Sequence, residues 1–106
     1  MGFFDIFRQP DIGQGVREYR ETAGAVLLDV RTGQEYAQGH IHGSRNIPLQ
    51  EIDRAVSVIG DKDTPLYVYC HSGARSRQAV LALQRMGYTN VANIGGIASY
   101  SGKVER

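Results

Sequence analysis

Short apolar runs along the chain predict the strands of a sheet. The runs AVLLDV at 25–30 and LYVYC at 66–70 are rich in branched and aromatic residues, and NVANI at 90–94 is a further candidate. Runs of this length are typical of strands that are buried on both faces of a parallel sheet. RNIPL at 45–49 predicts one more brief strand, which ends at Pro48.

Helices are predicted between these strands. Apolar residues recur at helical spacing in 13–24, 49–60 and 76–87, and a glycine ends each segment. A turn and a short helix are expected in 32–39. The residues predicted to share one face are Ile52, Ala55, Val56 and Ile59 in the second segment and Ala79, Val80, Leu83 and Met86 in the third. Strands that alternate with helices predict an α/β domain with a mainly parallel sheet.

The composition fits a single globular domain in the cytoplasm. The chain has 106 residues, of which 42% are hydrophobic and 22% charged, and its formal net charge is +1. These values suit one compact core, and the sequence shows neither a basic stripe for nucleic acid nor an apolar run that could span a membrane. A single cysteine cannot form a disulfide within the chain, which fits a reducing compartment. The first residues, MGFFDIFRQP, lack the basic start and unbroken apolar run of a signal peptide.

We expect one domain over residues 1–106, with an N-terminal arm at 1–10 and a tail at 102–106. Phe3, Phe4 and Phe7 of the arm are expected to pack on the core rather than to form a free apolar segment. A short helix is expected to follow the last strand before the tail begins.

Cys70, the only cysteine, lies where a predicted strand ends. Ligands of open α/β sheets bind just beyond the carboxyl ends of the strands. The residues between Cys70 and the helix that is expected to begin near Arg75 are His71, Ser72, Gly73 and Ala74. Gly73 allows a positive φ, so this small loop can curl with its N–H groups pointing inward as an anion-binding nest. The nest and the positive end of the helix dipole both favour the thiolate, which is the nucleophilic form.

A core cysteine is the structural alternative. A lone cysteine at a strand end is often only a small apolar residue. Here a loop of small residues, an arginine and a helix start follow Cys70 directly. Together they favour a nucleophile that attacks a group carried by an oxyanion.

Three motifs, in this order, resemble those of a single-domain rhodanese, a sulfurtransferase. LLDVRTGQEYAQGHIHGSRNIPL at 27–49 resembles the first signature of the family, YVYCHSGARS at 67–76 its active-site loop, and NIGGIASY at 93–100 its closing Gly-Gly motif. The chain departs from the family where Tyr100 replaces a frequent tryptophan and His42 a frequent proline. These two departures bear on the shape of the pocket and on the preferred acceptor.

The resemblance implies a rhodanese-like three-layer fold, in which helices cover both faces of a mainly parallel sheet. It also implies a persulfide mechanism that needs no metal or organic cofactor. Cys70 would take the outer sulfur of a donor such as thiosulfate or a persulfide and pass it to cyanide, a thiol or a protein partner. Neither a nucleic-acid partner nor a membrane partner follows from the resemblance, and it implies no particular oligomeric state.

The spacing between Cys70 and Arg75 distinguishes this chain from some members of the family. Rhodanese-like phosphatases of the cell-cycle type have a loop that is one residue longer, which makes a wider cradle that fits a phosphate. Four residues separate Cys70 from Arg75 here, and a loop of this length fits a sulfur atom. Phosphatase or arsenate reductase activity is therefore disfavoured.

Other polar residues of the active-site loop have both functional and structural interpretations. Arg75 is expected to fix the loop and to add positive charge near the thiolate. Ser72 and Ser76 are candidates for hydrogen bonds to the sulfur anion, and Ser76 is equally suited to capping the helix. The functional interpretation of His71 is that it tunes the loop or the choice of acceptor, and that of Arg77 is that it steers thiosulfate. For both residues an exposed side chain is the preferred interpretation.

Four residues of the first signature are also singled out. Asp29 is expected to tie loops together by hydrogen bonds, and Glu35 to pair with a nearby arginine. Arg31 is a candidate for lining the pocket. His40 is interpreted as a packing and hydrogen-bonding residue rather than a metal ligand, because zinc sites usually show paired ligands at close spacings.

Two alternatives to a sulfurtransferase remain open. Rhodanese-like domains also serve as binding or regulatory modules, but those commonly lack the cysteine that this chain retains. An activated thiol is also prone to oxidation, which is the property that a redox sensor uses. The sulfurtransferase is the preferred hypothesis.

Overall fold

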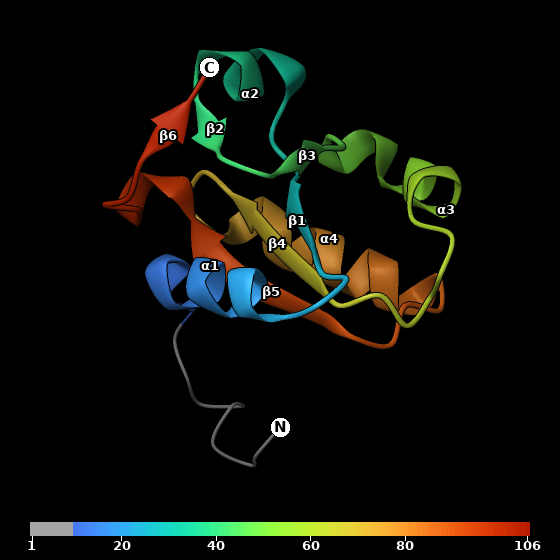
Figure 1. The fold of residues 1–106 in the computed structure, drawn as a ribbon. Helices are drawn as coiled ribbons and strands as arrows, with labels where there is room; N and C mark the ends of the chain where they lie inside the picture. The colour runs from blue at the N-terminus through green and yellow to red at the C-terminus, as the bar shows by residue number, and fades with distance from the viewer. Residues whose placement is uncertain (1–9) are drawn as a thin grey trace.

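The computed structural model describes residues 10–106. The N-terminal arm, including Phe3, Phe4 and Phe7, therefore lies outside the described residues except for Pro10. A four-stranded sheet forms the centre of the fold (Figure 1). Its strands, in the order in which they lie side by side, are β3 (Arg45–Asn46), β1 (Val26–Asp29), β4 (Leu66–Cys70) and β5 (Val91–Gly96).

All neighbouring strands of this sheet are parallel. Leu28 of β1 lies opposite Val68 of β4, and Asp29 lies opposite Asn46 of β3. The predicted mainly parallel sheet is thus confirmed. Because the strands run in the same direction, their carboxyl ends meet at one edge of the sheet, where Cys70 is the last residue of β4.

Helices cover both faces of the sheet, and each face has its own apolar cluster. The helix α1 (Ile12–Glu21) lies on one face, and α3 (Ala55–Val58) and α4 (Ala74–Arg85) lie on the other. The cluster under α1 consists of Ile12, Val16, Leu27, Ile41, Tyr69 and Ile94. The cluster under α3 and α4 contains Leu28, Val30, Ala55, Ile59, Leu66, Val68, Cys70, Ala79 and Leu83. Successive strand residues point to opposite faces, so the apolar residues of β1 and β4 build both clusters and give the three-layer architecture.

Local sequence signals begin and end these helices. The Asp11 carboxylate accepts the Gln14 N–H at the start of α1. At α2 (Gly33–Gln38), Thr32 and Glu35 form a capping box. Gly87, with a φ of +104°, follows the end of α4, as its position in the sequence predicted.

The segment 49–60 differs from the single helix that its apolar pattern predicted. Leu49–Arg54 is a 3₁₀-helix, η2, with a non-helical residue at Glu51, and α3 covers only the four residues that follow. A 3₁₀-helix has about 3.0 residues per turn, so the apolar stripe expected for an α-helix does not stay on one face. Ala55 and Ile59 are buried, whereas Val56 is 50% exposed. The prediction that Val56 shares the core-facing side is therefore wrong.

A second, two-stranded sheet joins the end of the chain to the segment after α2. The short 3₁₀-helix η3 (Ile97–Ser99) follows β5, and β6 (Val104–Glu105) follows η3. The strand β6 pairs with β2 (His40–Ile41) in antiparallel orientation. The segment 102–106, predicted as a tail, thus contains a paired strand (Figure 1). Within residues 10–106, every helix is too short or too polar to cross a membrane.

Candidate active site

The loop after β4 curls around the sulfur of Cys70. Gly73 has a φ of +103°, the left-handed value that its position predicted, and α4 begins at the next residue. The Gly73 N–H donates to the Cys70 Sγ over 3.0 Å, and the Ser76 Oγ lies 3.4 Å from the same sulfur. Donors that converge on one atom in this way make a binding site for an anion.

Burial and hydrogen bonding act on the pKa of Cys70 in opposite directions. Burial raises this pKa, because a thiolate is poorly solvated in the interior. The Ser76 hydroxyl and the backbone N–H groups of Ser76, Gly73 and Ser72 lower it, and the resulting pKa lies below the ordinary value of a cysteine. The loop therefore favours the thiolate, which is the nucleophilic form.

Cys70 also belongs to the core, as the structural alternative predicted. The residue is fully buried and packs in the cluster between the sheet and α4. The two interpretations are compatible, because a buried sulfur that accepts hydrogen bonds still holds a negative charge.

Gly96 allows β5 to touch the active-site loop. A Cβ atom at this position would lie 2.1 Å from the His71 carbonyl oxygen and 2.6 Å from the Ser72 Cα. Only glycine avoids these collisions, which are with backbone atoms that cannot rotate away. The Ala98 N–H donates to the same His71 carbonyl over 3.1 Å. The end of β5 and the residues after it thus hold one side of the loop.

Asn93 fixes the loop from within β5, a role that the sequence reasoning missed. The Asn93 Oδ1 accepts the Gly95 N–H at 3.0 Å and the Ser76 hydroxyl at 2.7 Å, and the Asn93 Nδ2 donates to the Gly73 carbonyl at 3.3 Å. The Ser76 hydroxyl has one hydrogen for three acceptors, which are Asn93, the Gly73 carbonyl and Cys70. A polar residue within an otherwise apolar strand was the only signal of this role in the sequence.

Arg75 is paired with Glu35 of α2. The Arg75 Nη1 and Nη2 donate to the two Glu35 carboxylate oxygens over 2.7 and 3.0 Å. Arg75 and the Thr32 N–H and hydroxyl outweigh the opposing effect of partial burial and lower the pKa of Glu35 to about 2. The expected pairing of Glu35 with an arginine is confirmed, and it joins the first turn of α4 to the first turn of α2.

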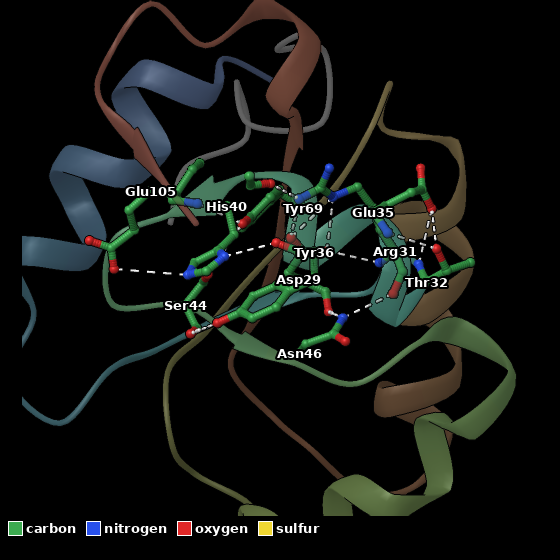
Figure 2. A network of polar contacts seen from close by, with 12 residues as sticks. Asp29, Arg31, Thr32, Glu35, Tyr36, His40, Ser44, Asn46, Tyr69 and Glu105 are labelled. Carbon is green, nitrogen blue, oxygen red and sulfur yellow. Dashed lines mark hydrogen bonds and ion pairs between the residues drawn. The ribbon is translucent and has the colours of Figure 1, made fainter.

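Asp29 and Arg31 form a buried ion pair at the end of β1 (Figure 2). The Arg31 Nη2 donates to the Asp29 carboxylate over 2.7 Å and to the Gly39 carbonyl over 2.6 Å. The Asn46 Nδ2 donates to the carbonyl oxygens of both Asp29 and Arg31. These bonds tie β1, β3 and the end of α2 together, as the expectation for Asp29 required. Lining of the pocket by Arg31 stays a prediction, since its described partners are structural.

The family model that describes the rhodanese-like domain matches residues 14–103 of this chain. The chain belongs to the rhodanese-like family. The thiosulfate sulfurtransferase PspE of Escherichia coli is 44% identical over 71 residues, which cover 66% of this chain and 68% of PspE. The thiosulfate sulfurtransferase GlpE of Pseudomonas aeruginosa is 36% identical over 76% of this chain and 72% of its own length.

Solved structures of the family have the same fold. The structure named "rhodanese with anions from E. coli" has a TM-score of 0.72 and 37% identity, and the match covers 77% of this chain and 98% of that one. The Rhodanese_3-like domain of the Anabaena protein Alr3790 also has a TM-score of 0.72, with 33% identity over 77% of this chain and 99% of that domain. The expected rhodanese-like fold is therefore confirmed.

The predicted loop residues have different surroundings in the structure. Gly73 and Ser76 bond to the Cys70 sulfur, and Arg75 pairs with Glu35. His71, Ser72 and Ala74 are exposed, and of these the backbone N–H of Ser72 acts on the sulfur. Arg77, interpreted as an exposed helix residue, is exposed.

The described contacts of His40, His42 and Tyr100 do not include Cys70. His40 stacks on Tyr36 with ring centroids 3.8 Å apart and bonds to the Tyr36 carbonyl, as its structural interpretation predicted. His42 contacts the Glu105 carboxylate. Tyr100 packs against the cluster under α1, on the face of the sheet opposite Cys70. Its described contacts thus lie outside the apolar cluster that contains the sulfur.

Proposed function

We propose that this chain is a sulfurtransferase that carries a sulfane sulfur on Cys70 as a persulfide. The main support for this proposal is that several donors of the loop lie close to the Cys70 sulfur, with the Gly73 N–H at 3.0 Å. Donors that are fixed before the reaction stabilise a negative charge at little reorganisation cost. Membership of the rhodanese-like family and the relatives named thiosulfate sulfurtransferase support the same activity.

The first step of the proposed reaction loads the cysteine. The Cys70 thiolate attacks the outer sulfur of thiosulfate, a new S–S bond forms, and the bond between the two donor sulfurs breaks. Sulfite leaves with the electron pair of that bond, and Cys70 holds the group Cys–S–S⁻. The charge is the same on both sides, and the step requires no cofactor.

The second step unloads the cysteine. A nucleophile attacks the outer sulfur of the persulfide, and the Cys70 thiolate is the leaving group. Cyanide gives thiocyanate, and a thiolate acceptor gives a new persulfide, R–S–S⁻. A leaving group that the loop stabilises departs more easily, so the loop donors assist this second step. In the first step they raise the fraction of Cys70 that is present as the thiolate. In the cell, we expect a thiol or a protein as the acceptor and the cytoplasm as the compartment.

The test is sulfur loading of the purified chain, followed by intact mass. After incubation with thiosulfate, we expect a gain of the mass of one sulfur atom, which cyanide removes with formation of thiocyanate. Cys70→Ser should show no gain, and Ser57→Ala, a change of an exposed serine on α3, should load normally. Thermal unfolding of each variant shows whether it is folded.

Two results would overturn the proposal. One is a folded protein that takes up no sulfur from thiosulfate or from an alkyl persulfide. The other is sulfur uptake that persists in Cys70→Ser. In the first case, turnover of an aryl phosphate would identify a phosphatase, and a lack of turnover would leave the non-catalytic binding module as the preferred function.

A further inference from the structure

Two ion pairs lie around the active-site loop, and each of them places a carboxylate on an arginine. Arg75 is paired with Glu35, and Arg31 with Asp29. The Glu35 hydrogen bonds raise the pKa of Arg75 most, whereas burial lowers the pKa of Arg31 and Asp29 outweighs that effect. We call these four residues the charge network; its two cations and two anions give it no net charge.

Arg75 is the member of this network that is coupled to the active-site sulfur. Arg75 lies between Gly73 and Ser76, which both bond to the Cys70 sulfur. The Glu35 hydrogen bonds raise the pKa of Arg75 most, and a negative charge on Cys70 raises it further. Two N–H donors of Arg75, one on each terminal nitrogen, are bonded to Glu35, so these two donors do not serve a substrate anion while the ion pair is intact. Arg77 follows two residues later on α4, and residues at that spacing do not share a helix face.

We propose that Glu35 is a specificity-determining residue, which neutralises Arg75 and thereby directs the site towards sulfur donors of low charge. This inference rests on the proposed function, and it concerns the choice of donor. The loop N–H groups offer partial charges that suit one charged sulfur. While Glu35 is paired with Arg75, the network has no net positive charge. It therefore does not compensate a second or third negative charge on the reactants.

The charge of the reactants differs between the two classes of donor. The Cys70 thiolate and thiosulfate together carry three negative charges. With a protonated persulfide, R–S–SH, the reactants carry one: the thiolate bonds to the outer sulfur, the donor S–S bond breaks, and R–S⁻ leaves with the electron pair, giving Cys–S–SH. Repulsion between like charges at short range costs several-fold in rate unless a cation compensates it. A site with a neutral charge network therefore favours the persulfide.

The test compares two alkylating reagents of similar size and different charge. Iodoacetate is an anion and iodoacetamide is neutral, and both modify the Cys70 thiolate. We expect Glu35→Gln to raise the ratio of the iodoacetate rate to the iodoacetamide rate about threefold to tenfold, because Arg75 loses its counter-charge. Arg75→Gln should lower the ratio, and the double variant, with both charges removed, should return it to the value of the unmodified chain.

Matched controls separate charge from folding. Glutamine also serves at the third position of a capping box, so Glu35→Gln retains the cap of α2. Thr32→Ala removes the side-chain cap but leaves the pair between Glu35 and Arg75 intact. We expect no change of the reagent ratio in Thr32→Ala. An unchanged ratio in Glu35→Gln, or an equal change in Thr32→Ala, would overturn the role of Glu35.

Sulfur donors complete the test. In Glu35→Gln, kcat/KM for thiosulfate should rise by about the same threefold to tenfold factor as the reagent ratio, whereas kcat/KM for an alkyl persulfide that reacts in its protonated form should hardly change. A rise for both donors would contradict charge selection. A chain that never takes up sulfur but shows the changed reagent ratio would overturn the proposed function alone, whereas normal sulfur loading with an unchanged ratio would overturn only the role of Glu35.

Discussion

The ends of the neighbouring strands β1 and β4 lie at the same edge of the sheet but are built in opposite ways. After β4, small residues let the backbone curl, and its N–H groups point at the Cys70 sulfur. After β1, the polar contacts are made by side chains. The Arg31 guanidinium donates to the Asp29 carboxylate and to the Gly39 carbonyl. The end of β4 thus holds an anion-binding loop, whereas the end of β1 holds an ion pair whose polar groups are bonded to each other.

The difference explains why only one strand end is expected to react. The polar groups after β1 are already bonded within the chain, and no buried side-chain N or O atom of residues 10–106 lacks a hydrogen-bond partner. The donors after β4 converge on a sulfur whose charge and substituents change during the proposed reaction. We therefore expect substitutions after β4 to change activity more than stability, and substitutions after β1 to do the reverse.

The largest effect on activity short of removing Cys70 is expected for Gly96→Ala. The new Cβ would collide with the His71 carbonyl oxygen, and the loop would have to shift. A displacement of about 1 Å in a reacting group can cost about 100-fold in rate, and we expect at least that loss in sulfur loading. Gly60→Ala is the matched control, because nothing lies within 4 Å of its Cβ position. Similar activity in the two variants would show that the contact with β5 does not shape the loop.

The largest effect on stability is expected for Asp29→Asn. Arg31 would remain buried without its counter-charge, and breaking a buried ion pair costs about 3–5 kcal/mol. Urea unfolding measures the loss, and sulfur loading per folded molecule should fall much less than in Gly96→Ala. The control is Glu51→Gln, which breaks the exposed pair with Arg54 and should cost at most about 1 kcal/mol. An Asp29→Asn protein with normal stability would contradict the proposed division between the two strand ends.

A smaller effect is expected for Ser76→Ala, which separates the side-chain donor to Cys70 from the backbone donors of the loop. The variant loses a donor that lowers the pKa of Cys70, so this pKa should rise, and the alkylation rate should reach its half-maximum at higher pH. A hydrogen bond to a charged group contributes about 1.5–3 kcal/mol, so alkylation at neutral pH should slow by about tenfold to 100-fold. Asn93 keeps its bond with the Gly95 N–H in this variant. An unchanged pH profile would mean that the backbone donors alone set the charge of the sulfur.

The smallest effect concerns the pH dependence of stability through Glu35. Its pKa of about 2 in the folded chain lies below the unfolded value of about 4.3, so the ionised carboxylate stabilises the fold above pH 4.3. This contribution is lost as pH falls through 4 towards 2. The stability difference between the unmodified chain and Glu35→Gln should therefore be constant from pH 6 to pH 8 and shrink below pH 4, and it should stay within about 1 kcal/mol for a partly exposed pair. A difference that grows on acidification would contradict the assignment.

Much of the sheet and of the reactive loop could be predicted from local patterns. LYVYC is β4 from its first residue to its last, and the glycine at 73 has the positive φ that its place in the loop required. The helix predicted over 49–60 was wrong in type over 49–54, because apolar spacing does not distinguish an α-helix from a 3₁₀-helix that is interrupted at Glu51. The strand in the tail was missed, since β6 has two residues and exists through its pairing with β2.

The sequence by itself determined which backbone conformations are available near Cys70 and which residues are apolar enough to be buried. It also placed a thiol, small loop residues and a helix start in direct succession, because these features depend on neighbours in the chain. Only the tertiary structure decided the contacts between distant segments. Parallel strands bring their carboxyl ends to one edge, and so Asn93 meets Ser76, Gly96 meets His71, and Glu35 meets Arg75 across 40 positions of sequence.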